Sequence, residues 1–304
     1  MRPHCPSSLR DAQRHAGRAR TRALGRRAAR IGHDRVLRRL GTSAAAAAAA
    51  GLGWGWFEAG WVRLRVRRLA LPGLPPELDG LRIAHLSDFH LGVPSRGERA
   101  VRRAVEWVEL RQPDLTCITG DLLTRPGGER LLRELVARLP RCYAVLGNHD
   151  FGTARDPFSV AAPLSELGPA TLLADDARTI ELRGLRVQVA GLDPRTARRG
   201  GPRPEPDGAA DLRILLSHFP ATLDRLEPGD WHLVLAGHMH AGQIVLPYGR
   251  GRLHFAHPSA HYTQGVYRRP RGTMHVSPGL GTTFVPFRYF ARPEATELLL
   301  DAVP

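Results

Sequence analysis

Between residues 81 and 240 the sequence repeats one arrangement, a short apolar run that ends in a polar cluster. Five such clusters occur: Ser87–His90, Thr119–Asp121, Gly147–Asp150, Ser217–Pro220 and Gly237–His240. Short apolar runs between turn signals are typical of buried strands. In α/β sheets, binding sites gather at the carboxyl ends of the strands. The arrangement therefore predicts a strand-rich α/β fold with one polar site at the strand ends.

The apolar periodicity of the remaining sequence predicts the other elements. Val62–Leu71 alternates apolar residues with arginine, which is typical of a half-exposed strand. Further strands are predicted at Leu81–Ser87, Leu115–Thr119, Tyr143–Leu146, Thr179–Leu182, Leu185–Ala190, Leu212–Ser217, His232–Ala236, Ile244–Leu246, Leu253–Phe255, Gly265–Tyr267, Thr273–Ser277 and Ala295–Leu300. Helices are predicted at Glu98–Leu110, Glu129–Leu139, Pro157–Leu167 and Ala221–Leu226, and a loop at Arg195–Gly208. Alternating strands and helices, followed mostly by strands, indicate a mixed α/β sandwich.

The positive charge of the chain is concentrated near its N-terminus. All 44 basic residues are arginine, and the formal net charge is +15. Residues 1–40 hold 12 arginines against Asp11 and Asp34, a net +10, so residues 41–304 carry only +5. A nucleic-acid-binding module that uses this tail is an alternative function of a different class. Because the tail has no aromatic residues and the body is only mildly basic, nucleic acid is not the expected partner.

The segment after the tail has the features of an export signal or a membrane anchor. Arg38-Arg39 precedes Leu40–Phe57, a run of 18 residues without a charge that contains seven consecutive alanines. A twin arginine before a weakly apolar run is typical of a twin-arginine signal. The run also reaches the lower limit for one membrane span. Trp54, Trp56 and Trp61 could instead form the interfacial belt of an uncleaved anchor. A buried helix of the body is a third interpretation.

These features divide the chain into a basic, disordered tail (1–40), a signal or anchor (41–61) and a functional body (62–304). The excess of arginine before the apolar run places the tail inside and the body outside. The expected location is the inner membrane with the body on its outer, periplasmic face, or export. Because Met239 is the first methionine after Met1, a translation start near Val36 also stays open.

The five polar clusters contain a set of side chains that can bind a metal ion. Eight of them are oxygen or nitrogen donors: Asp88, His90, Asp121, Asn148, His149, His218, His238 and His240. Each cluster alone is ordinary, because a histidine after a strand more often caps or packs, and Gly-Asp is common in turns. Five clusters in this order, closed by His-x-His, indicate a metal site. The donor mixture suits Mn, Fe, Zn or Ni better than Ca.

This series of motifs resembles the calcineurin-like metallophosphoesterase superfamily. The family signature is Asp-x-His, Gly-Asp, Gly-Asn-His-Asp/Glu, His and Gly-His-x-His, and the match covers residues 80–300. The resemblance implies a four-layer α-β-β-α sandwich of two mixed sheets flanked by helices. Within the family the chain is similar to the small bacterial branch with a twin-arginine or membrane-anchor N-terminus. Glu58–Trp61, Gly242-Gln243 and Ser277–Thr282 carry this finer resemblance.

The resemblance also implies a role for each donor. Two divalent ions would share the carboxylate of Asp121 and a hydroxide that attacks the phosphorus. The first ion would be completed by Asp88, His90 and His240, and the second by Asn148, His218 and His238. His149 would donate a proton or a hydrogen bond to the leaving oxygen, with Asp150 setting its tautomer. Manganese is a leading candidate among the metals that the donors suit.

The remaining histidines are weaker candidates for the site. His85 is expected to be structural or to support a ligand, while His275 could lie near the metals. His232, His254, His257 and His261 have no partner at ligand spacing. The glycine turn at 279–281 leads into Phe284, Val285, Phe287, Tyr289 and Phe290. Core packing is the more common explanation for such a segment, and an apolar lip beside the site is the alternative.

The substrate is expected to be a phosphate ester. The outward location and the apolar segment favour a phosphodiester of the cell envelope or a lipid-linked one, hydrolysed by a phosphodiesterase that works as a monomer. The alternative within the family is a pyrophosphatase acting on a nucleotide-linked lipid such as UDP-diacylglucosamine, which would need a site facing the cytoplasm. A phosphoprotein phosphatase is disfavoured, because the body has no long insertion for docking a protein.

Overall fold

The computed structural model describes residues 39–199, 203–249, 251–255 and 260–303. The chain divides into two compact units, Met1–Gly53 and Trp54–Pro304. In the first unit the described residues, 39–53, are helical. No helix within the described ranges is both long and apolar enough to cross a membrane. The predicted tail, with Arg38 of the twin arginine, lies outside the described residues apart from positions 39 and 40.

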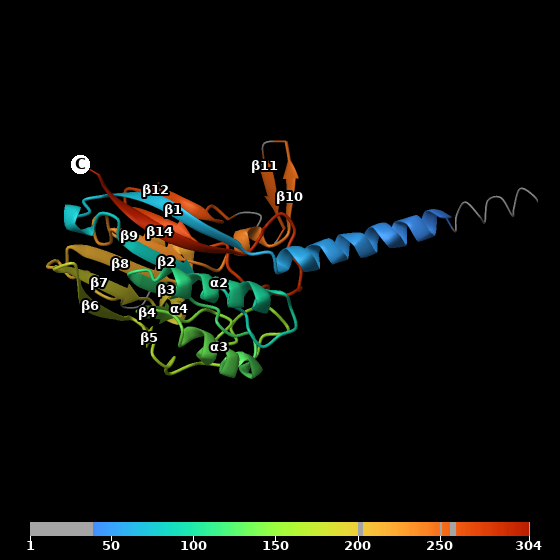
Figure 1. The fold of residues 1–304 in the computed structure, drawn as a ribbon, viewed down its shortest axis with the longest axis horizontal. Helices are drawn as coiled ribbons and strands as arrows, with labels where there is room; N and C mark the ends of the chain where they lie inside the picture. Colours follow the sequence, from blue (N-terminus) through green and yellow to red (C-terminus); the bar gives the residue numbers. More distant parts are fainter. Residues whose placement is uncertain (1–38, 200–202, 250, 256–259, 304) are drawn as a thin grey trace, which may run out of the picture. The chain divides into compact units, whose positions relative to one another are not determined.

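The second unit is built on two mixed β-sheets, each with six strands in the described residues (Figure 1). The first sheet has the order β1 (Arg63–Pro72), β14 (Glu294–Val303), β2 (Arg82–Leu86), β3 (Leu115–Thr119), β4 (Cys142–Val145) and β5 (Thr171–Leu172). The second has the order β12 (Gly265–Arg269), β13 (Gly272–Val276), β9 (Leu233–Ala236), β8 (Leu212–Ser217), β7 (Leu185–Gly191) and β6 (Asp176–Leu182). A separate hairpin joins β10 (Val245–Tyr248) to β11 (Gly251–His254).

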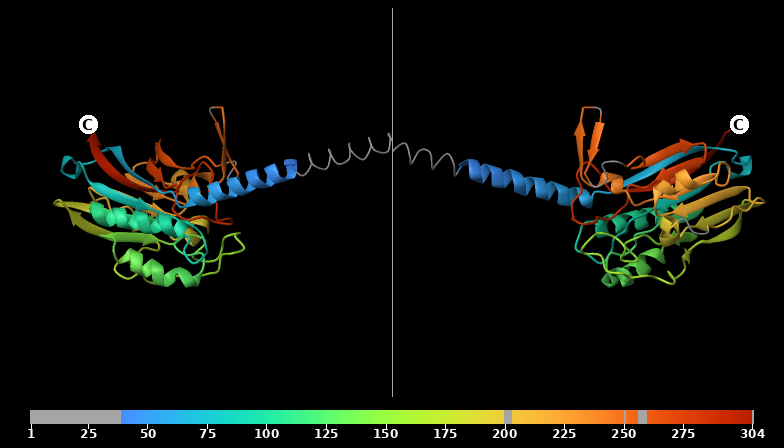
Figure 2. Two further views of the ribbon diagram at one scale, coloured as in Figure 1. Left: turned by 45° about the vertical axis from the view of Figure 1, so that its right-hand side comes forward. Right: turned by 180° about the vertical axis from the view of Figure 1, so that it is seen from behind.

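Helices lie on the outer faces of the two sheets, as two further views show (Figure 2). The first sheet is covered by α2 (Gly97–Arg111) and α3 (Glu129–Val136), and the second by α4 (Pro194–Arg199) and the 3-10 turn η3 (Pro220–Arg225). Shorter 3-10 turns are η1 (Pro76–Leu78), η2 (Pro126–Gly128) and η4 (His240–Gly242). Buried side chains of both sheets, such as Ile83, Leu115, Ile214 and Leu235, pack together between them. The predicted α/β sandwich of two mixed sheets flanked by helices is therefore confirmed.

Helix α2 shows how the sequence pattern produces the outer layer. Its buried side chains recur at helical spacing and form one apolar stripe: Ala100, Val101, Ala104, Val105 and Val108. This stripe packs into the core on the outer side of the first sheet. The helix ends where Gln112 adopts a left-handed conformation with φ of 48°. By contrast, all five residues of β3 are buried, because that strand is covered on both faces.

Strand direction brings the polar clusters together. β2, β3 and β4 are parallel neighbours in the first sheet, and β8 and β9 are parallel neighbours in the second. The carboxyl ends of parallel strands lie at the same edge of a sheet. Each of the five strands is followed by one of the polar clusters, so these clusters meet at one edge of the sandwich.

Two local predictions were wrong. Pro157–Leu167, predicted to be a helix, is irregular. Pro163 interrupts the helical pattern, and the amides of Val160 and Ala162 donate instead to the carbonyls of Thr124 and Asp150. The loop predicted at Arg195–Gly208 begins inside helix α4. Asp193 promotes that helix, because its carboxylate accepts a hydrogen bond from the amide of Arg195.

Candidate metal centre

The five strand ends bring seven of the eight predicted donors into two adjoining groups. Asp88, His90, Asp121 and His240 place one ligand atom each within 4.8 Å of one another, and all four residues are buried. Asp121, His218 and His238 form a second such group. Asn148 joins the second group, since its Oδ1 lies 3.0 Å from Nε2 of His218. Asp121 belongs to both groups, as a carboxylate between two ions would.

The imidazole nitrogens of the centre face one another at short range. Nε2 of His90 lies 3.0 Å from Nε2 of His240, and Nδ1 of His238 lies 3.1 Å from Nε2 of His218. Oδ2 of Asp121 lies 3.2 Å from Nε2 of His218 and 3.6 Å from Nε2 of His90. Nitrogen and carboxylate donors that converge in this way suit borderline divalent ions. The donor set therefore fits a pair of metal ions, and it does not discriminate among Mn, Fe, Zn and Ni.

The backbone of the centre is held in an unusual conformation. Five of the converging residues have a positive φ of 48° to 73°: Asp88, His90, Asp121, His238 and His240. Non-glycine residues rarely adopt the left-handed region, and such strain clusters at functional sites. Close packing adds a second demand, because a Cβ on Gly147 would collide with the Asp121 carboxylate and one on Gly237 with Ser87 Oγ. The glycines of Gly-Asn-His-Asp and Gly-His-x-His thus leave room for the ligands.

Electrostatics prepare the donors for a cation. Burial lowers the pKa of His218, but the adjacent Asp121 carboxylate outweighs burial and raises this pKa to about 9. Burial would raise the pKa of Asp121, yet His218 holds it well below its usual range. Burial and neighbouring imidazoles lower the pKa of His90 and His240 well below the usual value. Near neutral pH the centre therefore presents an ionised carboxylate at Asp121 and neutral imidazoles at His90 and His240.

His149 lies at the edge of the centre, outside both ligand groups. Its Nε2 is 4.0 Å from Oδ2 of Asp121 and 3.3 Å from Oγ1 of Thr283. Oγ1 of Thr283 donates to Oδ2 of Asp156 at 2.9 Å, which leaves Thr283 able to accept from His149. Burial lowers the pKa of His149, although Asp121 and Asp156 act in the opposite direction.

Asp150 does not contact the imidazole of His149, which corrects the prediction that it sets the tautomer of that ring. Its carboxylate accepts hydrogen bonds from the amides of Gly147, Leu122 and Leu123. Nδ1 of His149 has no hydrogen-bond partner among the described residues. Burial raises the pKa of Asp150 to about 7, despite these amides. Asp150 thus fixes the two loops that carry Asp121 and Asn148.

Three residues that contact the centre were not predicted from the sequence. Asp156 and Thr283 hold His149, and Arg288 is fully buried behind His240. Nη2 of Arg288 lies 3.1 Å from Nδ1 of His240, and the guanidinium also donates to the carbonyls of Gly281 and Pro278. Since arginine only donates, Nδ1 of His240 is the acceptor. No spacing rule marks these residues, because they lie in irregular segments outside the motifs.

Two further histidines form a pair in the core, apart from the metal centre. Nδ1 of His85 lies 2.8 Å from Nδ1 of His275, and Nε2 of His85 lies 3.0 Å from Oγ1 of Thr119. Both imidazoles are fully buried. Neither His85 nor His275 belongs to a ligand group in the described residues.

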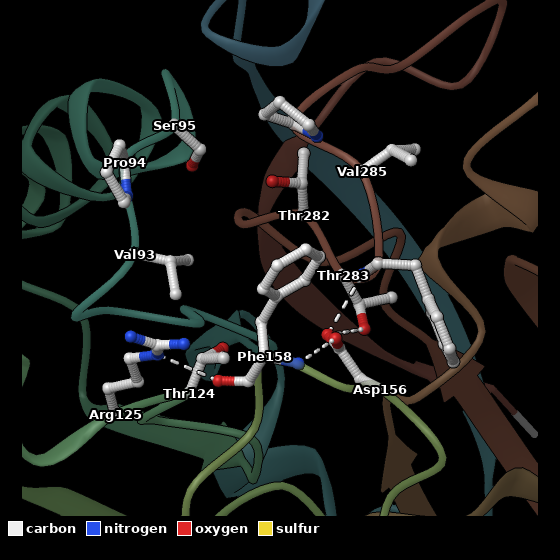
Figure 3. Close-up of a pocket in the computed structure, with 12 residues that line it drawn as sticks. Val93, Pro94, Ser95, Thr124, Arg125, Asp156, Phe158, Thr282, Thr283 and Val285 are labelled. Atoms are coloured by element: carbon white, nitrogen blue, oxygen red, sulfur yellow. Dashed lines mark hydrogen bonds between the residues drawn. The ribbon is translucent and has the colours of Figure 1, made fainter.

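Figure 3 shows an apolar pocket of about 420 Å³. It adjoins the centre on the side of His149, because Thr283 lines the pocket and its Oγ1 lies 3.3 Å from Nε2 of His149. Phe158 projects into the pocket, and Asp156 and Thr283 bond to each other in its wall. Its other lining residues are Val93, Pro94, Ser95, Thr124, Arg125, Thr282, Phe284, Val285 and Pro286. Phe284 and Val285 are 49% and 38% exposed. The segment after the glycine turn therefore forms an apolar lip, and core packing was the wrong explanation for these two residues.

The fold and the paired ligand groups define a metal-dependent phosphoesterase. A family model described as calcineurin-like phosphoesterase matches residues 81–242, and the chain belongs to this family of hydrolases. Metallophosphoesterase YkuE of Bacillus subtilis is 29% identical over 75% of this chain and 82% of its own length. Phosphodiesterase YaeI of Escherichia coli is 26% identical over 80% of this chain and 90% of its own length. UDP-2,3-diacylglucosamine pyrophosphatase LpxG of Chlamydia trachomatis is 27% identical over 61% of this chain and 71% of its own length.

Proposed function

We propose that the protein is a dinuclear phosphodiesterase that hydrolyses an envelope or lipid-linked phosphodiester. The observation that carries this proposal is the apolar pocket beside His149, because it offers a binding site for an apolar ester group next to the metal centre. The similarity to a phosphodiesterase supports the same reaction.

In this proposal Asp88, His90 and His240 would hold one ion, Asn148, His218 and His238 would hold the other, and Asp121 would be shared by both. Two ions held there would polarise the phosphate and would lower the pKa of a water molecule so that it could serve as nucleophile. Asp121 is suited to the bridge because its pKa stays low in the buried centre. His90 and His240 stay neutral near pH 7, because burial and neighbouring imidazoles lower their pKa.

His149 is proposed to donate a proton or a hydrogen bond to the leaving oxygen. Its Nε2 lies beside both ligand groups and is held by Thr283, which in turn is held by Asp156. Asp150 supports the reaction indirectly, because its contacts with backbone amides position the loops that carry Asp121 and Asn148. The apolar pocket begins at Thr283, so a group bound there would lie on the His149 side of the phosphate.

We also propose that residues 40–57 associate the protein with a membrane, with the catalytic body on the outer, periplasmic face, or that they direct its export. The charge-free run and the preceding arginines support this proposal. Trp54, Trp56 and Phe57, which are 37% to 47% exposed, are the side chains expected at a membrane interface. Fractionation of cells with protease access from the periplasmic side tests it, and a protease-resistant body in intact spheroplasts would overturn it.

The activity is tested with the full-length chain, bis-p-nitrophenyl phosphate and p-nitrophenyl phosphate, with added Mn²⁺ and after removal of metal by a chelator. We expect metal-dependent cleavage of the diester in preference to the monoester. A clear preference for the monoester would reject the phosphodiesterase, and metal binding without cleavage of either ester would reject general diester hydrolysis.

Pyrophosphate hydrolysis on a nucleotide-linked lipid is the second candidate, because the chain is similar to a UDP-2,3-diacylglucosamine pyrophosphatase. It is distinguished by supplying UDP-diacylglucosamine to the metal-loaded protein. Release of UMP at a rate above that of diester cleavage would favour this candidate over the phosphodiesterase.

A further inference from the structure

A second recess also adjoins the centre. Its lining is cationic, whereas that of the apolar pocket is mostly hydrophobic. It has a volume of about 170 Å³ and is lined by Asn148, Thr153, Pro194, Arg195, Arg198 and Arg199. Asn148 is the proposed ligand of the second ion, so this recess opens directly onto the metal centre. A neighbouring pocket of about 290 Å³ includes Arg198, Arg225 and His238, another proposed ligand of the same ion.

The three arginines of helix α4 are not equivalent. Arg195 pairs with Asp193 at 2.6 Å and lies over the ring of Phe151 at 4.1 Å, so its charge is compensated. Arg198 and Arg199 have no carboxylate within salt-bridge distance among the described residues, and both are exposed. The recess therefore carries two uncompensated positive charges beside the second ion.

Arg198 is also positioned by the centre itself. Its guanidinium lies 5.3 Å from the ring of Phe219, and that ring packs against the imidazoles of His218 and His238 at 5.0 Å and 4.8 Å. One aromatic ring thus separates Arg198 from the second ligand group. Arg225 fixes the end of α4 by donating to the carbonyl of Ala197 at 2.9 Å. The helix is held in place while the Arg198 side chain stays available to a ligand.

The two sides of the centre therefore differ in chemistry. The apolar pocket contacts the first ligand group through Thr124, whose Oγ1 lies 3.0 Å from Nδ1 of His90. In that pocket Arg125 donates to the carbonyl of Phe158, and Asp156 is bonded to Thr283. The arginine-lined recess contacts the second group instead. A phosphate held on both ions would have apolar surface toward one ester group and cationic surface toward the other.

We propose that the arginine-lined recess binds a second anionic group of the substrate, a phosphate or a carboxylate. The substrate class is then an amphiphilic phosphodiester, with an apolar group on one ester oxygen and a negatively charged group on the other. This inference rests on the proposed function and narrows its substrate. Arginine suits the role because its planar guanidinium can bind a carboxylate or phosphate through two parallel hydrogen bonds.

Binding of matched phosphonates to the metal-loaded, full-length protein tests the proposal without hydrolysis. Propylphosphonate is compared with 2-carboxyethyl and 4-carboxybutyl phosphonate by titration calorimetry. We expect at least one carboxylate to bind about tenfold more tightly than the propyl compound, which corresponds to about 1.4 kcal/mol. The preference should shrink at high salt, because the recess is open to solvent.

The double variant Arg198→Gln, Arg199→Gln should lose this preference while it binds propylphosphonate as before and retains two ions per chain. Arg130→Gln is the matched control, since Arg130 is 92% exposed on α3 and lines neither pocket. Equal affinities for all three phosphonates in the wild type, or an unchanged preference in the double variant, would overturn the subsite. An equal loss for propyl and carboxylate compounds would also overturn it, because such a loss reports damage to the centre.

Hydrolysis then separates this inference from the proposed function. Propyl p-nitrophenyl phosphate and 2-carboxyethyl p-nitrophenyl phosphate are compared with the same variants. If neither diester is cleaved but the carboxylate preference in binding holds, the subsite stands and the diesterase fails. If both diesters are cleaved and the arginine substitutions do not change the ratio of their two kcat/KM values, the diesterase stands and the subsite fails.

Discussion

Two pairs of buried histidines, each with its two imidazoles close together, differ in the side chains that surround them. His90 and His240 belong to the metal centre, and their Nε2 atoms are 3.0 Å apart. His85 and His275 lie in the core between the sheets, and their Nδ1 atoms are 2.8 Å apart. Burial lowers the pKa of all four imidazoles. By burial, spacing and pKa alone the two pairs are alike.

Carboxylates distinguish the two pairs. Oδ1 of Asp88 lies 3.4 Å from His240, and Oδ2 of Asp121 lies 3.6 Å from His90. In the core pair, the imidazole of His85 contacts the uncharged hydroxyl of Thr119 instead of a carboxylate. A divalent cation needs negative charge to offset the cost of leaving water. In the described residues, the imidazole pair that belongs to a metal-ligand group is the one that has carboxylates beside it.

Asp121→Asn should have the largest effect, because it removes the carboxylate shared by both ligand groups. We expect loss of both ions and a fall in diester hydrolysis of more than about 10³-fold. Substitution of residues that only orient the ligands already lowers metal affinity or activity about 10–100-fold. Metal content by mass spectrometry and kcat/KM measure the two effects. The core variant His85→Gln should keep both ions, and metal loss in this control would erase the distinction between the pairs.

His149→Ala tests whether a buried imidazole beside the ions acts without binding them. Because His149 lies outside both ligand groups, we expect hydrolysis to fall about 10²–10⁴-fold with both ions retained. A leaving group with a low pKa should recover part of the rate, since it needs less protonation. Thr283→Val should cause a smaller loss of the same kind. Loss of metal in His149→Ala would make this residue a ligand instead.

Removal of metal should destabilise the protein at the metal centre and leave the contribution of the core pair unchanged. At metal concentrations near 1000 times Kd, each ion contributes about 4 kcal/mol to the free energy of unfolding. Urea titration with Mn²⁺ and with a chelator measures this difference. It should vanish in Asp121→Asn and persist in His275→Gln. A metal-dependent stability that survives in Asp121→Asn would place the ions elsewhere.

The core pair should control the acid stability of the metal-free protein. Burial, with a smaller effect of Arg67, lowers the pKa of His275 from 6.5 to about 3. The unfolded chain therefore takes up this proton first as the pH falls, so stability is full above about pH 6.5 and is lost toward pH 3 at about 1.4 kcal/mol per pH unit. Urea unfolding with chelator at pH 5 and 7 should show a shallower dependence for His275→Gln. An unchanged slope would show that His275 is already protonated in the folded state.

The sequence predicted the strands and the converging donors because both follow short-range patterns. Strand ends such as Asp88 and His240 are marked by apolar runs and by motif spacing, and the parallel strands bring them together. Asp150 was in the motif, but its direction toward backbone amides depends on loop geometry. Asp156 and Arg288 were not predicted, because they approach the centre through irregular segments that no periodicity marks. Pro157–Leu167 has helical spacing, yet its prolines and tertiary hydrogen bonds prevent a helix.

The order of strands in the first sheet also has a consequence for the kinetics of folding. β14 lies between β1 and β2, so it pairs with segments more than 200 positions earlier in the chain. Until β14 has been synthesised, β1 lacks its partner and one edge of β2 is open. Contacts so distant in sequence slow folding and leave strand edges exposed to aggregation. We expect a slow refolding phase that reports insertion of β14, and a nascent chain that depends on protection from aggregation until this strand is in place.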